Sequence, residues 1–148
     1  MYSMIDSRLY DQNRFYKAFT CDLKHAKSYV LIESPFITIR RLDTLLPTLQ
    51  KLCVKGVKVI VNTKPLEEHD TLLYRQALQA ISSLQEIGVT VLMTVGHHRK
   101  IAVIDDILWE GSLNILSQND SCEVMRRIES PGLAEQMLKF TKLRRYFR

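Results

Sequence analysis

The chain has 148 residues, of which 46% are hydrophobic and 25% charged, proportions that exclude a disordered chain, a collagen and a coiled-coil rod. Lysine and arginine outnumber aspartate and glutamate by 21 to 16, which gives a net charge of +5. A basic chain favours polyanionic partners without choosing among nucleic acid, membrane headgroups and free phosphates.

Helix-like and strand-like patterns alternate along the chain. Apolar residues recur at helical spacing in three segments, which predict helices over residues 13–27, 42–54 and 70–87. Each helix is followed by a short apolar run typical of a strand, at residues 29–32, 57–61 and 89–95. Pro47 indicates a start or a kink in the second helix, and Gly56 and Gly88 mark helix ends.

The second half of the chain adds further strands and a closing helix. Residues 100–105 and 107–109 are expected to pair across a tight turn, residues 122–128 form a further strand, and residues 132–147 form the last helix. The alternation predicts a single domain over residues 1–148, with an α/β layered sandwich fold. Its central sheet is predicted to be mixed but largely parallel, flanked by helices, with the hairpin supplying the antiparallel part.

No segment favours a membrane or an oxidising compartment. The apolar run 89–95 is far shorter than the roughly 20 residues that a helix needs to cross a bilayer. Asp6 and Arg8 interrupt the pattern of a signal peptide. The three cysteines match neither a disulfide framework nor zinc-ligand spacing: Cys21, Cys53 and Cys122. We expect a cytoplasmic protein with ordinary thiols and without stable membrane insertion, with a nucleophilic role for Cys122 left open.

The chemically informative stretch is residues 96–123. His98 and Lys100 are two positions apart beside a predicted strand, so they are expected to point the same way, about 7 Å apart. Lysine is a point charge suited to a phosphate oxygen, and histidine can act as a nucleophile or as a general acid and base. Ser112 and Asn114 follow in a turn and add a hydroxyl and an amide. This group is suited to binding an anion and moving a proton.

The same combination resembles the phospholipase D superfamily, whose signature is His-x-Lys, four residues, Asp, and then Gly-Ser-x-Asn. The matching positions are His98, Lys100, Asp105, Gly111, Ser112 and Asn114. The Ser34-Pro35-Phe36 turn, Gly56 and the segment 128–131 also look like the small bacterial members of this superfamily and like the domains appended to some helicase-type proteins.

The resemblance implies a phospholipase D-like fold and a phosphodiesterase that uses neither a metal nor another cofactor. One histidine attacks phosphorus and forms a phosphohistidine, while a second histidine protonates the leaving oxygen and then activates water. Paired lysine and asparagine side chains hold the non-bridging oxygens. Because this chain carries one copy of the motif, the resemblance implies a homodimer in which two copies of His98 face each other across a two-fold axis.

An acidic residue is expected to orient the imidazole of His98. In the small nuclease-like relatives this is a glutamate that follows the Gly-Ser-x-Asn turn, a place that Glu123 occupies here, with Glu110 and Asp120 as alternatives. Asp105 belongs to the motif but is expected to support the structure through backbone and turn hydrogen bonds at the far end of its strand. Ser112 is expected to bond either phosphate or Glu123.

Several basic residues beside the motif have two interpretations. Arg40 and Arg41 follow the turn after the first strand, and Lys64 follows the second strand, where loops border the ligand crevice of α/β sheets. These residues, together with Arg99 inside the motif, are either contacts to phosphate or plain solvated charges. The basic segment 139–148 is most simply a solvated helix face, with a contact to the phosphate backbone as the alternative.

The remaining histidines and the tryptophan have simpler interpretations. His97 is expected to lie on the opposite face from His98, and His25 and His69 to lie at the surface. Trp109 is expected in the core or in the wall of the site, with exposed stacking on a base as the alternative.

The resemblance to the small bacterial members, together with the basic balance and the small size, favours a nuclease that acts on DNA. Little sequence preference is expected, because no segment has the pattern of a helix-turn-helix or a zinc finger. Specificity would then come from an attached domain or a helicase-type partner. A phospholipase or phosphatidyl transferase is the first alternative, although no amphipathic helix with a wide apolar face is evident. The second is a non-catalytic dimer that binds nucleic acid, which would not require a nucleophilic histidine.

Overall fold

One sheet of seven strands runs through the computed structural model, which describes residues 5–118 and 120–147. The strands lie in the order β1-β7-β6-β5-β2-β3-β4. Their bounds are β1 (Asp6–Asp11), β2 (Tyr29–Glu33), β3 (Lys58–Thr63), β4 (Thr90–Met93), β5 (Ile101–Ile104), β6 (Ile107–Gly111) and β7 (Val124–Glu129).

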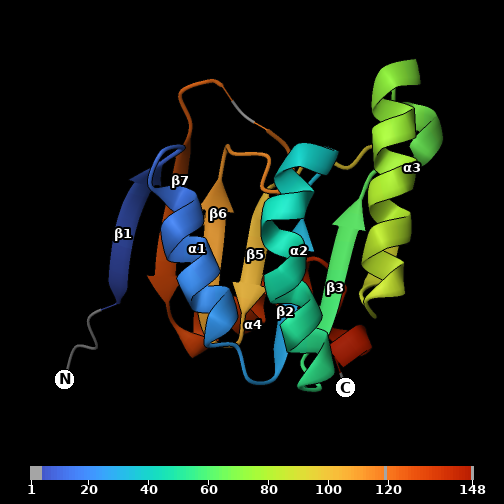
Figure 1. The fold of residues 1–148 in the computed structure, drawn as a ribbon. Helices are drawn as coiled ribbons and strands as arrows, with labels where there is room; N and C mark the ends of the chain where they lie inside the picture. The colour runs from blue at the N-terminus through green and yellow to red at the C-terminus, as the bar shows by residue number, and fades with distance from the viewer. Residues whose placement is uncertain (1–4, 119, 148) are drawn as a thin grey trace.

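Helices cover both faces of this sheet. Their bounds are α1 (Phe15–Lys24), α2 (Ile39–Val54), α3 (Thr71–Glu86) and α4 (Pro131–Phe140), with short 3-10 helices η1 (Leu66–Glu68) and η2 (Arg144–Phe147). Figure 1 shows α1 and α2 in front of the sheet and α4 behind it. The predicted α/β architecture with a mixed sheet between helices is thus confirmed.

The sheet is not largely parallel, and that part of the prediction is wrong. β2 pairs with β3 and β3 with β4 in parallel, whereas the pairs β5–β2, β5–β6, β6–β7 and β7–β1 are antiparallel. A parallel pair needs a long crossover, which α2 and α3 supply between β2, β3 and β4. β5 and β6 are instead joined by the tight turn at residues 105–106, so the chain reverses direction.

Alternation along the central strands divides the buried side chains between two cores. In β2, Val30 and Ile32 face the core under α1, α2 and α3, while Leu31 faces the core under α4. Both faces are buried, so the central strands are apolar at consecutive positions. In β5, Ala102 and Ile104 join the first core, whereas Ile101 and Val103 join the second. The carboxyl end of β2 therefore lies between two rigid layers.

Caps and backbone conformation explain the observed helix ends. The carboxylate of Asp70 accepts the N–H of Leu73 at 3.0 Å and starts α3, and the Ser130 hydroxyl starts α4 in the same way. The predicted helix over residues 132–147 is wrong in extent, because Lys142 has a φ of 64° and separates α4 from η2. No described helix is long and apolar enough to span a bilayer.

Candidate active site

The His-x-Lys segment and the Gly-Ser-x-Asn turn meet in one open cleft. His98, Lys100 and Ser112 line a cleft of about 790 Å³ together with Glu110 and Arg126. His98 is exposed, and Lys100 is half-buried with its ammonium donating to the His98 carbonyl at 2.7 Å. β5 begins at Ile101, so His98 and Lys100 precede the strand in which we expected Lys100. The histidine and the lysine nevertheless open on the same cleft, as the sequence predicted.

Gly111 is required by the close approach of β7. A Cβ atom at this position would lie 2.1 Å from the Val124 carbonyl oxygen and 2.9 Å from the Met125 Cα. The contact aligns the next residue, because the Ser112 N–H donates to the Val124 carbonyl at 2.9 Å and the Ser112 hydroxyl accepts the Val124 N–H at 3.1 Å. The glycine thus lets the turn lie flat against β7 and sets the position of the serine.

Glu123 lies beside this turn. Its carboxylate accepts the Ser112 hydroxyl at 3.5 Å, and its own N–H donates to the Gln12 side chain at 2.9 Å. It precedes β7, which starts two residues later than the predicted strand. Glu110 lines the cleft directly. Two of the three carboxylates considered from the sequence are therefore next to the motif, and Glu123 is the one in contact with Ser112.

Other predicted residues lie apart from the cleft. Among the described residues, Asn114, Arg40 and Lys64 are not part of its lining. Asn114 is half-buried in the turn, Arg40 is exposed, and the ammonium of Lys64 lies 4.0 Å from the centre of the Phe36 ring. Their roles at a phosphate stay predictions.

Asp105 supports the strand ends, as expected from its place in the motif. Its carboxylate accepts three backbone N–H groups, from Lys27 at 2.8 Å, Ser28 at 3.0 Å and Tyr29 at 3.2 Å. It has a φ of 49°, which aspartate tolerates better than most residues. Asp105 thereby ties the turn after β5 to the start of β2, and it is absent from the lining of the cleft.

Replacing Asp105 with asparagine is expected to lower the free energy of unfolding by about 2 kcal/mol. Asparagine tolerates the same backbone conformation but puts an NH₂ where one carboxylate oxygen accepts an N–H. Urea unfolding followed by circular dichroism measures the change. Asp106→Asn, at the exposed neighbouring position, is the matched control and should be as stable as the original chain. Equal stability of the two variants would contradict a stabilising role for the hydrogen bonds to the Asp105 carboxylate.

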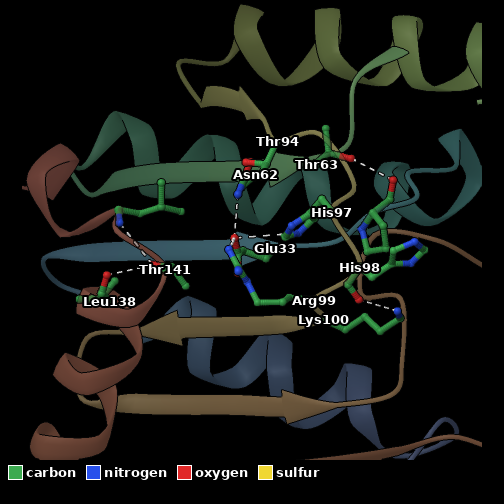
Figure 2. A network of polar contacts seen from close by, with 12 residues as sticks. Glu33, Asn62, Thr63, Thr94, His97, His98, Arg99, Lys100, Leu138 and Thr141 are labelled. Carbon is green, nitrogen blue, oxygen red and sulfur yellow. Dashed lines mark hydrogen bonds and ion pairs between the residues drawn. The ribbon is translucent and has the colours of Figure 1, made fainter. Parts of the chain in front are cut away.

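Arg99 lines the cleft and also binds a buried carboxylate that the sequence analysis missed. Its Nε and Nη2 donate to Glu33 at 2.8 and 2.9 Å, and Glu33 is fully buried (Figure 2). Asn62 donates to the same carboxylate at 2.7 Å and accepts the Thr94 hydroxyl at 3.0 Å. The hydrogen bonds to Glu33 raise the pKa of Arg99. The signal in the sequence was an acidic residue that directly ends an apolar strand.

His97 is buried on the inner side of the same segment. It is 3% exposed, and its Nε2 lies 3.9 Å from the Glu33 carboxylate. Burial lowers the pKa of His97, an effect that Glu33 opposes and that Arg99 and Lys100 reinforce. As predicted, it does not share the cleft with His98.

Acid is expected to destabilise the fold through His97. Because its pKa is lowered in the folded chain, the unfolded chain binds more protons once the pH falls below about 6.5. This contribution to the free energy of unfolding is constant above that pH and falls below it, by up to about 1.4 kcal/mol per pH unit. His69, whose pKa is also lowered by burial, adds to the slope. Urea unfolding at several pH values should give a shallower slope for His97→Gln than for the original chain, and equal slopes for the two proteins would refute this account.

The other aromatic and histidine predictions have mixed outcomes. Trp109 is fully buried and donates to Asp22 at 2.9 Å, so the core interpretation is confirmed and stacking on a base is wrong. His25 is exposed, as expected. His69 is half-buried with its ring 5.8 Å from that of Phe36, so its assignment to the surface is wrong.

Comparisons with known proteins agree with the motif and the fold. A family model described as cardiolipin synthase, PLD-like domain, matches residues 19–144. A comparison with curated proteins gives no match. The crystal structure of the phospholipase D family member Nuc from Salmonella typhimurium superposes with a TM-score of 0.75 at 16% identity, covering 97% of this chain and 96% of that one.

Two further solved structures share the fold. NucT from Helicobacter pylori has a TM-score of 0.75 and 17% identity, with 94% of each chain covered. Phosphatidylserine synthase from Haemophilus influenzae Rd KW20 has a TM-score of 0.66 and 14% identity, and this chain spans 39% of its length. These likenesses show the fold, and the family model covers most of the sequence. The chain belongs to the PLD-like domain family of the phospholipase D superfamily.

Proposed function

We propose that the protein is a phosphodiesterase that cuts DNA with little sequence preference and without a metal ion. The observation that carries this proposal is the convergence of His98, Lys100 and Ser112 on one open cleft, with Arg126 on its wall. A nucleophile, a fixed ammonium and a hydroxyl donor are the groups that an attack on a phosphodiester needs.

The proposed reaction has two steps. An imidazole nitrogen of His98 attacks phosphorus, the bond from phosphorus to the leaving oxygen breaks, and that oxygen takes a proton from a second imidazole. Water then gives a proton to the second imidazole and attacks phosphorus, and the phosphorus–nitrogen bond breaks to restore His98. Lys100 stabilises the negative charge on the non-bridging oxygens in both steps, and Ser112, Asn114 and Glu123 position the reacting groups.

The second imidazole is proposed to come from a partner subunit. One imidazole cannot carry the phosphoryl group and protonate the leaving oxygen in the same step, and the chain holds one complete copy of the signature that runs from His-x-Lys through Asp to Gly-Ser-x-Asn. Leu9 and Val124 line the cleft and are 61% and 47% exposed. Such an apolar rim suits contact with a second copy of the chain, so both the chemistry and this surface support a homodimer.

A phospholipase is the second candidate, and one observation favours it. An apolar groove of about 350 Å³ adjoins the cleft through the shared residue Glu110 and is lined by Leu108, Ile128, Leu133, Met137 and Phe140. A groove of this composition can take an acyl chain. DNA is preferred because of the net charge of +5 and the arginines at the cleft. The proposal also includes a helicase-type partner or an attached domain, and a cytoplasmic location.

Cleavage assays in EDTA test the proposal. Plasmid and single-stranded DNA are expected to be cut by the purified protein in the presence of EDTA. Vesicles of phosphatidylglycerol and cardiolipin, incubated in parallel, separate the two candidates, and light scattering gives the number of subunits. A strict need for a divalent cation, an active monomer, or faster turnover of lipid than of DNA would each overturn the corresponding part. Binding of DNA without any cleavage would favour the non-catalytic dimer.

A further inference from the structure

A buried carboxylate lies directly under the segment that carries His98 and Lys100. Glu33 is the last residue of β2, is 0% exposed, and accepts hydrogen bonds from two groups, the guanidinium of Arg99 and the amide of Asn62. A buried charge is stable only when it is paired and hydrogen-bonded, so these contacts lock the carboxylate in place. Glu33 takes no part in the proposed reaction and is absent from the lining of the cleft.

Residues of the segment alternate between this carboxylate and the cleft. Figure 2 shows the side chains of His97 and Arg99 pointing toward Glu33, and those of His98 and Lys100 pointing away from it. Arg99 makes a two-pronged contact at 2.8 and 2.9 Å. Because Arg99 lies between His98 and Lys100 in the chain, fixing its side chain on the inner side directs its two neighbours outward.

Little else in the backbone holds this segment. β5 starts only at Ile101. Outside the strands, the backbone hydrogen bonds of the described residues that tie residues 97–100 are long: His97 N–H to Thr94 at 3.3 Å and Gly111 N–H to Lys100 at 3.4 Å. The contact between Glu33 and Arg99 is shorter than both, and the planar guanidinium fixes direction as well as distance.

Glu33 is itself held by a chain of polar contacts across three strands. Asn62 lies opposite Glu33 in the register of β2 and β3, is 1% exposed, and accepts the hydroxyl of Thr94, which follows β4. The carboxyl ends of the three parallel strands are thus joined by hydrogen bonds to the carboxylate that binds Arg99. Through these hydrogen bonds, the sheet restricts the movement of Arg99, which lies outside the strands.

We propose that Glu33 is a positioning residue: by holding Arg99 it sets the directions in which His98 and Lys100 enter the cleft. The inference rests on the proposed function of these two residues. The same contact pairs the charge of Arg99, which also lines the cleft, with a buried carboxylate.

Kinetics of Glu33→Gln test this role. Glutamine keeps the shape and can still accept from Asn62, but it loses the charge that holds Arg99. The expected result is a kcat for DNA cleavage lowered by about 10-fold to 100-fold, with KM changed by less than about twofold, because misplaced reacting groups slow the chemical step. Glu67→Gln, on the exposed surface of η1, is the matched control and should match the original kcat. An unchanged kcat in Glu33→Gln would overturn the proposal.

The double variant Glu33→Gln with Arg99→Met separates positioning from independent effects. If Glu33 acts through Arg99, the double variant should be no slower than the slower single variant. Fold-losses that multiply would show independent roles and overturn the proposal. The double variant buries no unpaired charge, so it can be tested even if Glu33→Gln does not fold. In that case the double variant should fold and have a kcat at least about 10-fold below that of the original chain. An unchanged kcat in the double variant would overturn the proposal.

Backbone NMR relaxation distinguishes failure of this inference from failure of the proposed function. The order parameters of the amides of residues 98 and 100 are expected to fall from about 0.85 to below about 0.6 in Glu33→Gln, and to stay high in Glu67→Gln. This measurement needs no substrate. Absence of cleavage by the original chain together with this fall would refute the phosphodiesterase and leave the positioning role intact, whereas unchanged order parameters would refute the positioning role.

Discussion

Replacing His98 with alanine is expected to abolish DNA cleavage in EDTA, lowering the rate by at least about 10⁴-fold. In the proposed dimer this one change removes both the nucleophile and the proton donor. The side chain is exposed, so the free energy of unfolding should change by less than about 0.5 kcal/mol. Initial rates on plasmid DNA measure the cleavage, urea unfolding followed by circular dichroism measures the stability, and light scattering of the same samples should show an unchanged number of subunits. His25→Ala, at another exposed histidine, is the control and should cut at the original rate.

Mixing the original protein with His98→Ala tests whether two copies of His98 serve one phosphate. When subunits of the original chain and of His98→Ala exchange freely, the fraction of dimers with two intact histidines is the square of the intact fraction. Activity should therefore fall with that square if both imidazoles serve one phosphate. A linear fall would mean that each His98 works alone and would contradict the shared site. Cleavage retained by pure His98→Ala would contradict the nucleophile itself.

Replacing Gly111 with alanine is expected to lower the free energy of unfolding by about 3 kcal/mol. The new methyl group would lie 2.1 Å from the Val124 carbonyl oxygen, so β6 or β7 must move. Any such movement also displaces Ser112, which hydrogen-bonds to Val124, so cleavage per folded molecule should fall too. Urea unfolding and initial rates measure the two effects.

Gly132→Ala is the matched control for this substitution. Gly132 lies in the first turn of α4, and a Cβ atom there would meet only the Ser130 hydroxyl, at 3.9 Å. Alanine favours helix over glycine by up to about 1 kcal/mol, so this variant should be at least as stable as the original chain. If Gly111→Ala were equally stable, the close approach of β7 would not explain the glycine of the motif.

The helices and strands that bury one or both faces could be predicted from the sequence. Helices α1 to α3 and the apolar strands between them follow from the spacing of their apolar residues. β1 was not predicted, because Asp6–Asp11 is polar and mostly exposed and is held by pairing with β7. Strand direction was wrongly predicted because side chains alternate in the same way in parallel and antiparallel strands. The direction of a strand depends instead on the connections between strands.

The sequence predicted the residues of the motif but not the buried carboxylate behind them. The motif placed His98, Lys100 and Ser112 correctly on one cleft, because their spacing in sequence is short and local geometry brings them together. Glu33 was missed because its partner Arg99 is 66 residues away, and an acidic residue at the end of a strand usually faces water. Pairs of this kind are created by the order of strands in the sheet, which places β2 beside β5.

The pairing of β1 with β7 has a consequence for biosynthesis. The one neighbour of Asp6–Asp11 in the described sheet is Val124–Glu129, which is translated more than a hundred residues after it. β7 also brings Val124 and Arg126 to the cleft, so a nascent polypeptide that lacks this strand has an open and incomplete wall there. In the proposed function, the wall of the cleft is therefore completed only after β7 has been made and has paired with a strand translated long before it.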